Sequence, residues 1–375
     1  MAAPAARTVA RLQPLVENTL DRTADKREVV CGIIGDHPSE YAKSPGIWTA
    51  AFEDLGTDAI YLPFDVTKEK LPSLVDALRH CDGYAGGNVT VPYKVAVMDL
   101  LDELDPAAAQ IGAVNTICKT SDGRLIGYNT DADGALGSLL RPTPWQAQPL
   151  LATLDGLRVL LIGAGGAARA TAFAVASQLG DRGSLAIANR SQPGAQALAA
   201  AVSAVHGNAE AVDGGAVSGA VAGADLVINA SVVGQSGIRR LAEDRLTCLE
   251  PYSPLAPANA VVFAASAHPS DAGLYRAWFD ASSEDIAANQ RMSARAVVGA
   301  PAAAAFFDLI YSPLETTFLR QARLSGHATL NGKGMNIIQA VEAFVTRVMA
   351  PRLNADGWKR EVAYARVFQA MLGAW

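Results

Sequence analysis

A short apolar run that ends in a cluster of glycines constrains the fold of this 375-residue chain more than any other feature. Residues 158–162 read Arg-Val-Leu-Leu-Ile, as a buried strand does, and a glycine-rich turn leads from them into a helix that we expect to end near Leu179. Glycines at such a turn let the backbone approach a pyrophosphate, and the helix N-terminus offers free amides and a positive dipole end. The same glycines would also suit a tight turn that binds nothing, so the surrounding pattern has to decide.

The pattern around this turn favours a dinucleotide site at Gly163, Gly165 and Gly166. Strand candidates at 185–188 and 225–229, with a helix candidate between them, complete a series of βαβ units. We therefore predict a Rossmann-type domain over residues 150–333.

The end of the second strand of this domain indicates which cofactor it binds. An NAD-specific protein usually places an acidic residue there to bind the ribose hydroxyls, whereas this chain has Asn189-Arg190-Ser191. A cation and a hydroxyl suit a 2′-phosphate, so the sequence favours NADP over NAD. Arg190 could instead be a solvated surface arginine, but the missing acid and the added cation agree with each other.

Residues 29–140 predict another α/β domain, in which strands and helices alternate before a hairpin. Its expected strands are 29–35, 60–66, 84–91, 113–118 and 125–128, and its expected helices begin at Ser44, Leu71, Pro92 and Asp131. We expect the Ser44 side chain to cap its helix, because serine can bind the free amides and Pro45 loses no bond at the first helical position.

Other segments set the domain organisation. The proline-rich residues 141–149 suit a linker, and helices are expected over 334–349 and 356–373. Residues 236–300 form an added segment that contains no interpretable motif. Residues 1–28 lack an apolar signal core, so we expect a mobile or surface-packed extension.

Composition excludes several classes of protein. Half of the residues are hydrophobic and 18% are charged, so a chain of this length can bury the cores of two domains. The formal net charge is −6 with no basic stripe, so no nucleic-acid partner is expected. No apolar stretch is long enough to suggest a membrane span. Four scattered cysteines indicate free thiols in a reducing, cytoplasmic compartment, and five histidines without ligand spacing indicate no metal.

Polar residues gather where the strands of the first domain end, the usual ligand-binding edge of an open α/β sheet. They are Asn88, Thr90, Lys94, Asn115, Asn129, Thr130 and Asp131. Hydride transfer to a ketone leaves an alkoxide, and a lysine held by an aspartate could supply the proton that it needs. Lys94 could instead be solvated, and Asp131 could only cap a helix.

Several strings, in order along the chain, resemble the shikimate dehydrogenase family. The chain contains Gly87-Asn-Val-Thr-Val-Pro-Tyr-Lys94, Ile111-Gly-Ala-Val-Asn-Thr116, Ile126-Gly-Tyr-Asn-Thr-Asp131, Leu161-Ile-Gly-Ala-Gly-Gly-Ala167, Asn189-Arg-Ser191, Ile228-Asn-Ala-Ser231, Tyr311-Ser-Pro-Leu-Glu-Thr316 and Asn331-Gly-Lys-Gly-Met-Asn-Ile-Ile-Gln-Ala340. They cover roughly residues 29–350, apart from 236–300, and together they are far more specific than any one string.

The resemblance implies an enzyme that reversibly reduces 3-dehydroshikimate with NADPH, in aromatic amino acid biosynthesis, or that performs related quinate chemistry. It implies that Lys94 and Asp131 are the catalytic pair. Substrate contacts are implied for Ser44, Thr90, Asn115, Tyr311 and Gln339, with Ser44 and Tyr311 at the ring carboxylate. Cofactor contacts are implied for Gly163, Ala164, Gly165, Gly166, Ala167, Asn189, Arg190, Ser191, Asn229, Ala230, Ser231, Gly334 and Met335. The C-terminal helices, from about residue 334, would return to the first domain.

The chain departs from the family pattern at three positions. The family usually presents Ser-x-Ser-Pro to the substrate carboxylate, whereas this chain has Ala42-Lys-Ser-Pro45 after a loop that is one residue longer. Ser39 or Tyr41 could replace the missing hydroxyl. Lys333 and Asn336 stand where the family is usually apolar, and they either add polar contacts near the nicotinamide or face solvent on their helix.

These departures leave the substrate more open than the reaction type. The close alternative is a related dehydrogenase for quinate, an aminoshikimate or a carboxylate-free cyclitol. A non-catalytic sensor that binds cofactor or metabolite is a different class, which the intact Lys94 and Asp131 argue against. We expect a small polyhydroxylated ring acid as the binding partner and a monomer or homodimer as the oligomeric state.

Overall fold

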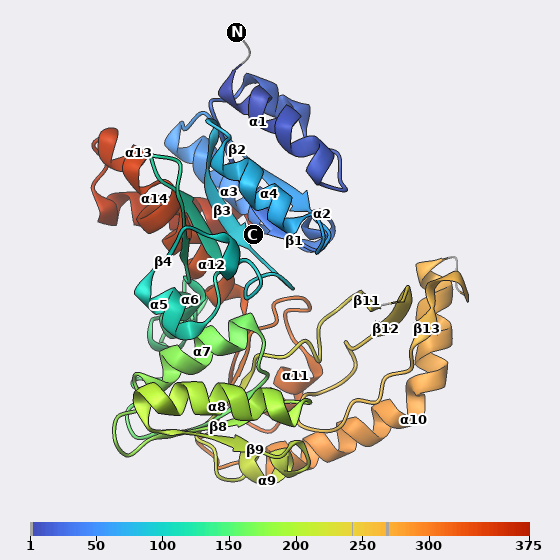
Figure 1. The fold of residues 1–375 in the computed structure, drawn as a ribbon. Helices are drawn as coiled ribbons and strands as arrows, with labels where there is room; N and C mark the ends of the chain where they lie inside the picture. Colours follow the sequence, from blue (N-terminus) through green and yellow to red (C-terminus); the bar gives the residue numbers. More distant parts are fainter. Residues whose placement is uncertain (1–2, 242, 268–269) are drawn as a thin grey trace. The chain divides into compact units, whose positions relative to one another are not determined.

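A computed structural model describes residues 3–241, 243–267 and 270–375. The described chain divides into two compact units (Figure 1). Unit 1 holds the residues through Ala135 together with Asn336–Trp375, and unit 2 holds Leu136–Met335. Residues 1–2 of the predicted extension, and residues 242 and 268–269 of the predicted added segment, lie outside the described residues.

Unit 1 is built on one mixed sheet in the order β2-β1-β3-β5-β6-β4. The strands are β1 (Val29–Gly35), β2 (Ala59–Asp65), β3 (Tyr84–Val89), β4 (Glu103–Leu104), β5 (Thr116–Lys119) and β6 (Leu125–Tyr128). β1 runs parallel to β2 and β3, whereas β5 is antiparallel to β3 and β6. Strand β5 begins later than the predicted residue 113, because the Val114 amide donates to the Lys94 carbonyl and the Ala113 carbonyl accepts from the Asn129 side chain.

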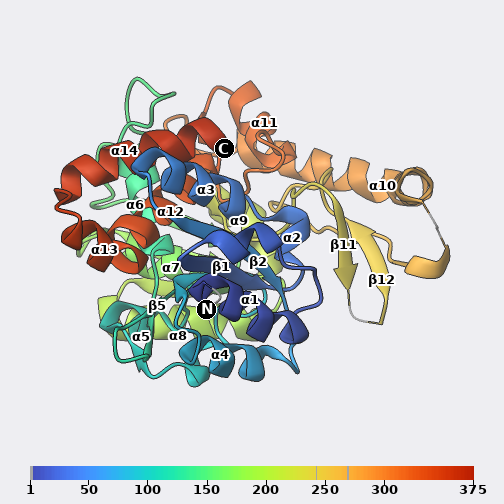
Figure 2. The same ribbon diagram turned by 90° about the horizontal axis from the view of Figure 1, so that it is seen from above.

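The two faces of this sheet are covered by different helices, as the alternation of side chains along a strand requires. Val30 and Ile34 of β1 face one core, which includes α1 (Pro4–Leu12) and α4 (Leu71–Arg79). Cys31 and Ile33 face the other, which includes the C-terminal helices. That second group comprises α3 (Ser44–Leu55), α12 (Lys333–Glu342), the π-helical η6 (Ala343–Val348), α13 (Ala350–Ala355) and α14 (Arg360–Ala374). Figure 2 shows α3 and α14 side by side on this face.

Residues from the predicted N-terminal extension pack into the core of unit 1. Ala5 and Leu12 of α1 are fully buried, and Leu20 is 2% exposed. Short 3-10 turns, η1 (Gln13–Leu15) and η2 (Arg22–Lys26), connect α1 to β1. The described part of the extension therefore adds apolar area to the core instead of projecting from it.

In unit 1 one predicted helix cap, at Ser44, and one predicted helix start, at Pro92, are wrong. α3 begins at Ser44, but Lys43 occupies the capping position and the cap has no side-chain hydrogen bond, so Ser44 does not cap its helix. Pro92 does not open an α-helix: turns follow it, and then the 3-10 turn η3 (Met98–Leu100). The Lys94 carbonyl bonds the distant Val114 amide, which removes an acceptor that a regular helix would use.

The other helices of unit 1 are two short ones and a longer one that continues into unit 2. They are α2 (Pro38–Tyr41), α5 (Pro106–Ile111) and α6 (Asp131–Leu140), and α6 crosses from unit 1 into unit 2.

Unit 2 contains a fully parallel sheet in the order β15-β14-β10-β7-β8-β9. Its strands are β7 (Arg158–Ile162), β8 (Ser184–Ala188), β9 (Ala209–Val212), β10 (Leu226–Asn229), β14 (Ala305–Asp308) and β15 (Ala328–Leu330), and its helices include α7 (Gly166–Ala176), α8 (Gln192–His206), α9 (Val217–Val221) and α11 (Thr317–Leu324). β7 lies between β10 and β8, so the chain order reverses beside the glycine turn, which is where open α/β sheets bind ligands.

The added segment folds into a small antiparallel sheet and a long helix within unit 2. The sheet has the order β11-β12-β13, from β11 (Ile238–Leu241), β12 (Arg245–Cys248) and β13 (Phe263–Ala264). A 3-10 turn, η5 (Ala265–Ala267), and the 28-residue helix α10 (Asp271–Val298) follow. Trp278 of α10 is buried, and its indole N–H lies 3.0 Å from the Val261 carbonyl and 3.3 Å from Thr247 Oγ1 of β12, which ties the helix to this sheet.

Two further properties of the structure concern the state of the cysteines and the apolar character of the helices. Cys31, Cys81, Cys118 and Cys248 are buried free thiols, as the sequence predicts. Within the described residues, no helix combines the length and the apolar character needed to cross a membrane.

Candidate active site

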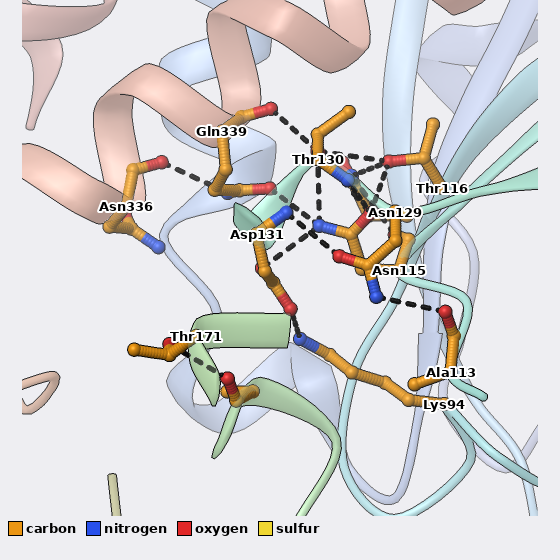
Figure 3. A network of polar contacts seen from close by, with 12 residues as sticks. Lys94, Ala113, Asn115, Thr116, Asn129, Thr130, Asp131, Thr171, Asn336 and Gln339 are labelled. Atoms are coloured by element: carbon orange, nitrogen blue, oxygen red, sulfur yellow. Dashed lines mark hydrogen bonds and ion pairs between the residues drawn. The ribbon is translucent and has the colours of Figure 1, made fainter. Parts of the chain in front are cut away.

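Lys94 and Asp131 form a close ion pair at the edge of the unit 1 sheet (Figure 3). Lys94 lies in the turns that follow β3, and Asp131 is the first residue of α6. The Lys94 Nζ atom lies 2.6 Å from Asp131 Oδ2, and the two side chains are 16% and 7% exposed. A partly buried ion pair of this kind keeps both groups in place while leaving the ammonium within reach of a ligand.

Asn115 links this pair to the neighbouring polar residues. Its Nδ2 atom lies 2.9 Å from Asp131 Oδ1, 3.0 Å from Thr130 Oγ1 and 3.3 Å from Gln339 Oε1. An amide has only two hydrogens, so these three acceptors cannot all be fully bonded. The most distant acceptor, Gln339 Oε1, is therefore the one most able to accept from a ligand hydroxyl.

The turn that precedes α6 fixes the Asp131 carboxylate. The Asp131 amide donates to Asn129 Oδ1 at 3.0 Å, and Asn129 Nδ2 donates to the Ala113 carbonyl at 2.8 Å. Thr130 donates its hydroxyl to the Gln339 carbonyl and its amide to Asn115 Oδ1. A side chain that bonds its own backbone two residues on is the usual property of asparagine at such a turn.

Tyr61 is a residue of this network that the sequence reasoning missed. Its hydroxyl donates to Asn88 Oδ1 at 2.7 Å, and Asn88 Nδ2 donates to the Asn115 carbonyl at 3.2 Å. Burial raises the pKa of Tyr61 well above its usual value, and a hydrogen bond with Ser44 opposes part of that rise. The network therefore connects Tyr61 of β2 to Asn115 through Asn88. A tyrosine inside a buried strand could have indicated this, because its hydroxyl needs a partner there.

Thr90 lies at the carboxyl end of β3, next to the end of β1. Its amide donates to the Ile34 carbonyl at 2.9 Å. A Cβ atom on Gly35 would come within 2.4 Å of Thr90 Cγ2, so the two strand ends are in close contact. Among the described residues Thr90 makes hydrogen bonds only through its backbone, which leaves its hydroxyl able to bind a ligand.

In unit 2 a glycine turn joins β7 to α7. Gly163 has φ +125°, and a Cβ atom there would lie 2.7 Å from the Ala230 carbonyl oxygen, so only glycine fits. Gly165 is the N-cap of α7, with no side-chain cap, and a Cβ atom there would meet nothing within 4 Å. Gly165 therefore places no side chain over the N-terminus of α7.

The segment after β8 presents an exposed cation. Arg190 is exposed, and within the described chain it has no ion-pair partner. The Ser191 side chain accepts from the Gly194 amide at 3.4 Å and so caps α8, while Asn189 Nδ2 donates to the Ser191 carbonyl. Arg190 directly precedes the N-cap residue of α8, and its exposed guanidinium is available to a phosphate.

The ends of β10 and β14 are joined by a buried pair. Asn229 donates to Asp308 Oδ1 at 3.0 Å and accepts from the amide and hydroxyl of Ser231. Thr316 donates to Asp308 Oδ2 at 2.7 Å. Burial raises the pKa of Asp308 to about 7. The sequence reasoning missed Asp308, because a strand that ends in aspartate gave no sign that the carboxyl is buried.

The remaining predicted contacts, Tyr311, Gly334 and Met335, belong to unit 2. Tyr311 is half-buried and Met335 is buried. A Cβ atom on Gly334 would lie 3.1 Å from Ser138 Oγ. Their roles stay predictions.

Both departures on α12 are in contact with indole rings. Lys333 Nζ lies 5.1 Å from the Trp145 ring centroid. Asn336 Oδ1 accepts from Trp375 Nε1 at 3.0 Å. Neither side chain is simply solvated on the helix surface.

The comparisons with known proteins agree with this arrangement. Residues 33–117 match the family model described as the shikimate dehydrogenase substrate binding domain. A shikimate dehydrogenase (NADP(+)) of Shouchella clausii is 34% identical over 308 residues, which cover 82% of this chain and 88% of that protein. The chain belongs to the shikimate dehydrogenase family.

Other members of the shikimate dehydrogenase family are similarly close. The shikimate dehydrogenase (NADP(+)) of Methanopyrus kandleri is 34% identical over 325 residues, covering 86% of this chain and 91% of that protein. A shikimate 5-dehydrogenase of Thermus thermophilus, solved in complex with NADP(H) and shikimate, has a TM-score of 0.59 at 27% identity and covers 91% of this chain and 99% of that chain. These likenesses confirm the predicted family and fold class.

Proposed function

We propose that this protein is an NADP-dependent oxidoreductase that interconverts 3-dehydroshikimate and shikimate. The family relatives and the glycine turn support the use of NADP, and the Lys94–Asp131 pair carries the proposal for the chemistry. We further propose that the protein is cytoplasmic and that it is a monomer or a homodimer. Sedimentation velocity would distinguish the two oligomeric states.

The proton step follows from the position of Lys94. When a ketone carbon accepts a hydride, its oxygen becomes an alkoxide, which takes a proton from the Lys94 ammonium. Asp131 holds that ammonium through Oδ2, while Asn115 fixes the other carboxylate oxygen. The partly exposed Lys94 then regains a proton from solvent, and the oxidation of the alcohol uses the same steps in reverse.

The ring contacts are proposed from the groups around this pair. Gln339 Oε1 and the Thr90 hydroxyl would bind ring hydroxyls together with Asn115. Ser44 and Tyr311 would bind the carboxylate. The polar network around Asn115 supports the assignments of Asn115 and Gln339, because it already aligns these two side chains in unit 1.

The residues of unit 2 fit NADP(H). Bound NADP(H) would supply or accept the hydride. Gly163, Gly165 and Gly166, with Ala164 and Ala167, would hold its pyrophosphate, because Gly165 opens the start of α7. Asn189, Arg190 and Ser191 would bind the 2′-phosphate. Asn229 would shape the loop that carries Ala230 and Ser231 toward the cofactor, and Gly334 and Met335 would contact the nicotinamide.

Replacing Lys94 by methionine tests the chemistry. The Lys94→Met variant keeps the length of the side chain and removes the ammonium, so we expect kcat to fall by about 10²–10⁴-fold. NADPH affinity, measured by the fluorescence of the bound nucleotide, should stay within about twofold, because the cofactor residues are unchanged.

The exposed Lys68 provides a matched control. Lys68→Met should keep wild-type kcat and NADPH affinity. Full turnover by Lys94→Met would remove the ammonium from the mechanism.

The second candidate function is the turnover of a related ring substrate. It is favoured by Ala42, which stands where the family usually has a serine. Wild-type enzyme should be assayed by NADPH absorbance with shikimate, quinate, an aminoshikimate and a cyclitol. Turnover of the cyclitol alone would replace the proposed substrate. NADPH binding without turnover of any ring would favour the sensor.

A further inference from the structure

The loop between β1 and α3 lacks a serine at position 42, and the structure shows why Ser39 does not replace it. The Ser39 amide donates to Asp65 Oδ1 at 2.9 Å, and its hydroxyl donates to Asp65 Oδ2. A hydroxyl has a single hydrogen, so Ser39 has none left for a substrate carboxylate.

Asp65 is itself held by the N-terminal segment. Its amide donates to Asn18 Oδ1 at 3.0 Å, and its carbonyl accepts from the Glu17 amide at 2.8 Å. Asn18 Nδ2 also donates to the Pro63 carbonyl at 3.0 Å. Residues 17 and 18 therefore run along the free edge of β2 and fix the end of this strand, where the buried Asp65 carboxylate binds Ser39.

Fixing Ser39 determines where Tyr41 lies. Ser39 and Tyr41 belong to the single turn α2, which the Ala42 amide closes by donating to the Pro38 carbonyl at 2.9 Å. A Cβ atom on Gly35 would lie 3.3 Å from the Tyr41 hydroxyl and 2.4 Å from Thr90 Cγ2. The Tyr41 hydroxyl thus reaches the end of β1 beside Thr90, whereas its ring is 40% exposed.

We propose that Tyr41 supplies the second hydroxyl to the substrate carboxylate in place of position 42, and that Asp65, oriented by Asn18, is the positioning residue for the loop. This inference rests on the proposed function, because it assigns the acid-binding end of that same site. On this proposal, the longer loop and the packed N-terminal segment act together. They place the Tyr41 hydroxyl where the family usually has the hydroxyl of a serine.

The Tyr41→Phe variant tests this role by removing only the hydroxyl. A hydrogen bond to a charged group changes affinity by about ten- to a hundredfold, so KM for shikimate should rise by at least about tenfold. The KM for NADP⁺ and kcat should stay within about twofold. Shikimate methyl ester, which has no carboxylate charge, should lose much less than shikimate. Tyr275→Phe, which alters an exposed tyrosine in α10, is the matched control.

Two further variants separate binding from a general effect on folding. Adding Ala42→Ser to Tyr41→Phe should restore at least half of the lost affinity, because it returns a hydroxyl at the family position. Asp65→Asn should raise KM for shikimate without changing the KM for NADP⁺, since it releases Ser39 and the loop.

The outcomes distinguish this inference from the proposed function. If wild-type enzyme oxidises shikimate and Tyr41→Phe is unchanged, or loses acid and ester equally, the role of Tyr41 is wrong while the proposed function stands. If wild-type enzyme turns over no ring acid, both are overturned.

Discussion

At the scale of single residues, Asp131 is the most constrained group in the site. Each of its carboxylate oxygens faces a donor: Oδ1 faces the Asn115 amide, and Oδ2 faces the Lys94 ammonium. A carboxamide in the same place must point its NH₂ group at one of these donors. No orientation of asparagine satisfies both neighbours.

We therefore expect Asp131→Asn to lower kcat by at least about a hundredfold, because the ammonium loses its fixed position. Steady-state kinetics would measure this, with NADPH affinity as the control that should not move. A kcat within twofold of wild type would show that the orientation of Lys94 does not matter.

Arg190 is another single residue with a predicted effect, because its guanidinium is expected to select NADP over NAD. Arg190→Ala should raise KM for NADP⁺ by about ten- to a hundredfold, since a charge-assisted hydrogen bond to the 2′-phosphate is lost. The KM for NAD⁺, which has no such phosphate, should change by less than about twofold. Arg182→Ala, at an exposed arginine of unit 2, is the comparison variant. Equal losses for both nucleotides would contradict the assignment.

At the scale of elements, Asp308 and Asn229 join the ends of β14 and β10. Burial raises the pKa of Asp308 from 3.8 to about 7, so the folded protein holds a proton that the unfolded chain releases between these pH values. Its contribution to the free energy of unfolding is complete below about pH 4. It is lost as the pH rises through about 7.

The resulting prediction concerns stability. The free energy of unfolding should fall by up to about 4 kcal/mol more in wild type than in Asp308→Asn between pH 4 and pH 7, because 1.36 kcal/mol accompanies each pKa unit. Asparagine resembles the protonated acid and does not titrate. Urea unfolding of both proteins across this range would measure the difference, and parallel curves would contradict it.

The strands and helices that the sequence predicted well are those in which an apolar run meets a clear turn. β1, β6 and β7 have the predicted bounds, and α6 begins at the predicted residue. The errors lie where long-range bonds compete with local ones. The turn after Pro92 is set by a bond to Val114, which no local pattern reveals. Likewise, α10 and its small sheet fold around Trp278, whose partners lie far away in the sequence.

At the scale of the whole molecule, unit 1 is completed only by the C-terminal residues. Ala363, Val367 and Met371 of α14 lie in the same core as Trp48 of α3. Gln339, which is 224 positions from Asn115, reaches the polar network from α12. Spacing alone could not have brought Lys94, Asp131 and Gln339 together, and only the resemblance to a family predicted all three.

A chain that ends at Met349 should therefore lose the folded structure of unit 1 but keep much of the folded structure of unit 2. It lacks α13 and α14, so the apolar face of α3 would be exposed to water. We expect no measurable turnover, whereas NADPH binding by residues 163–191 should remain. Near-ultraviolet circular dichroism and nucleotide fluorescence would measure the two effects. Turnover within tenfold of the complete protein would contradict the assignment of these helices to unit 1.

The contact between Asn115 and Gln339 also has a consequence during synthesis. Gln339 follows all of unit 2 in the chain, so it is synthesised only after Leu136–Met335 have been made. The polar network of unit 1 is therefore incomplete until every residue of unit 2 has been synthesised.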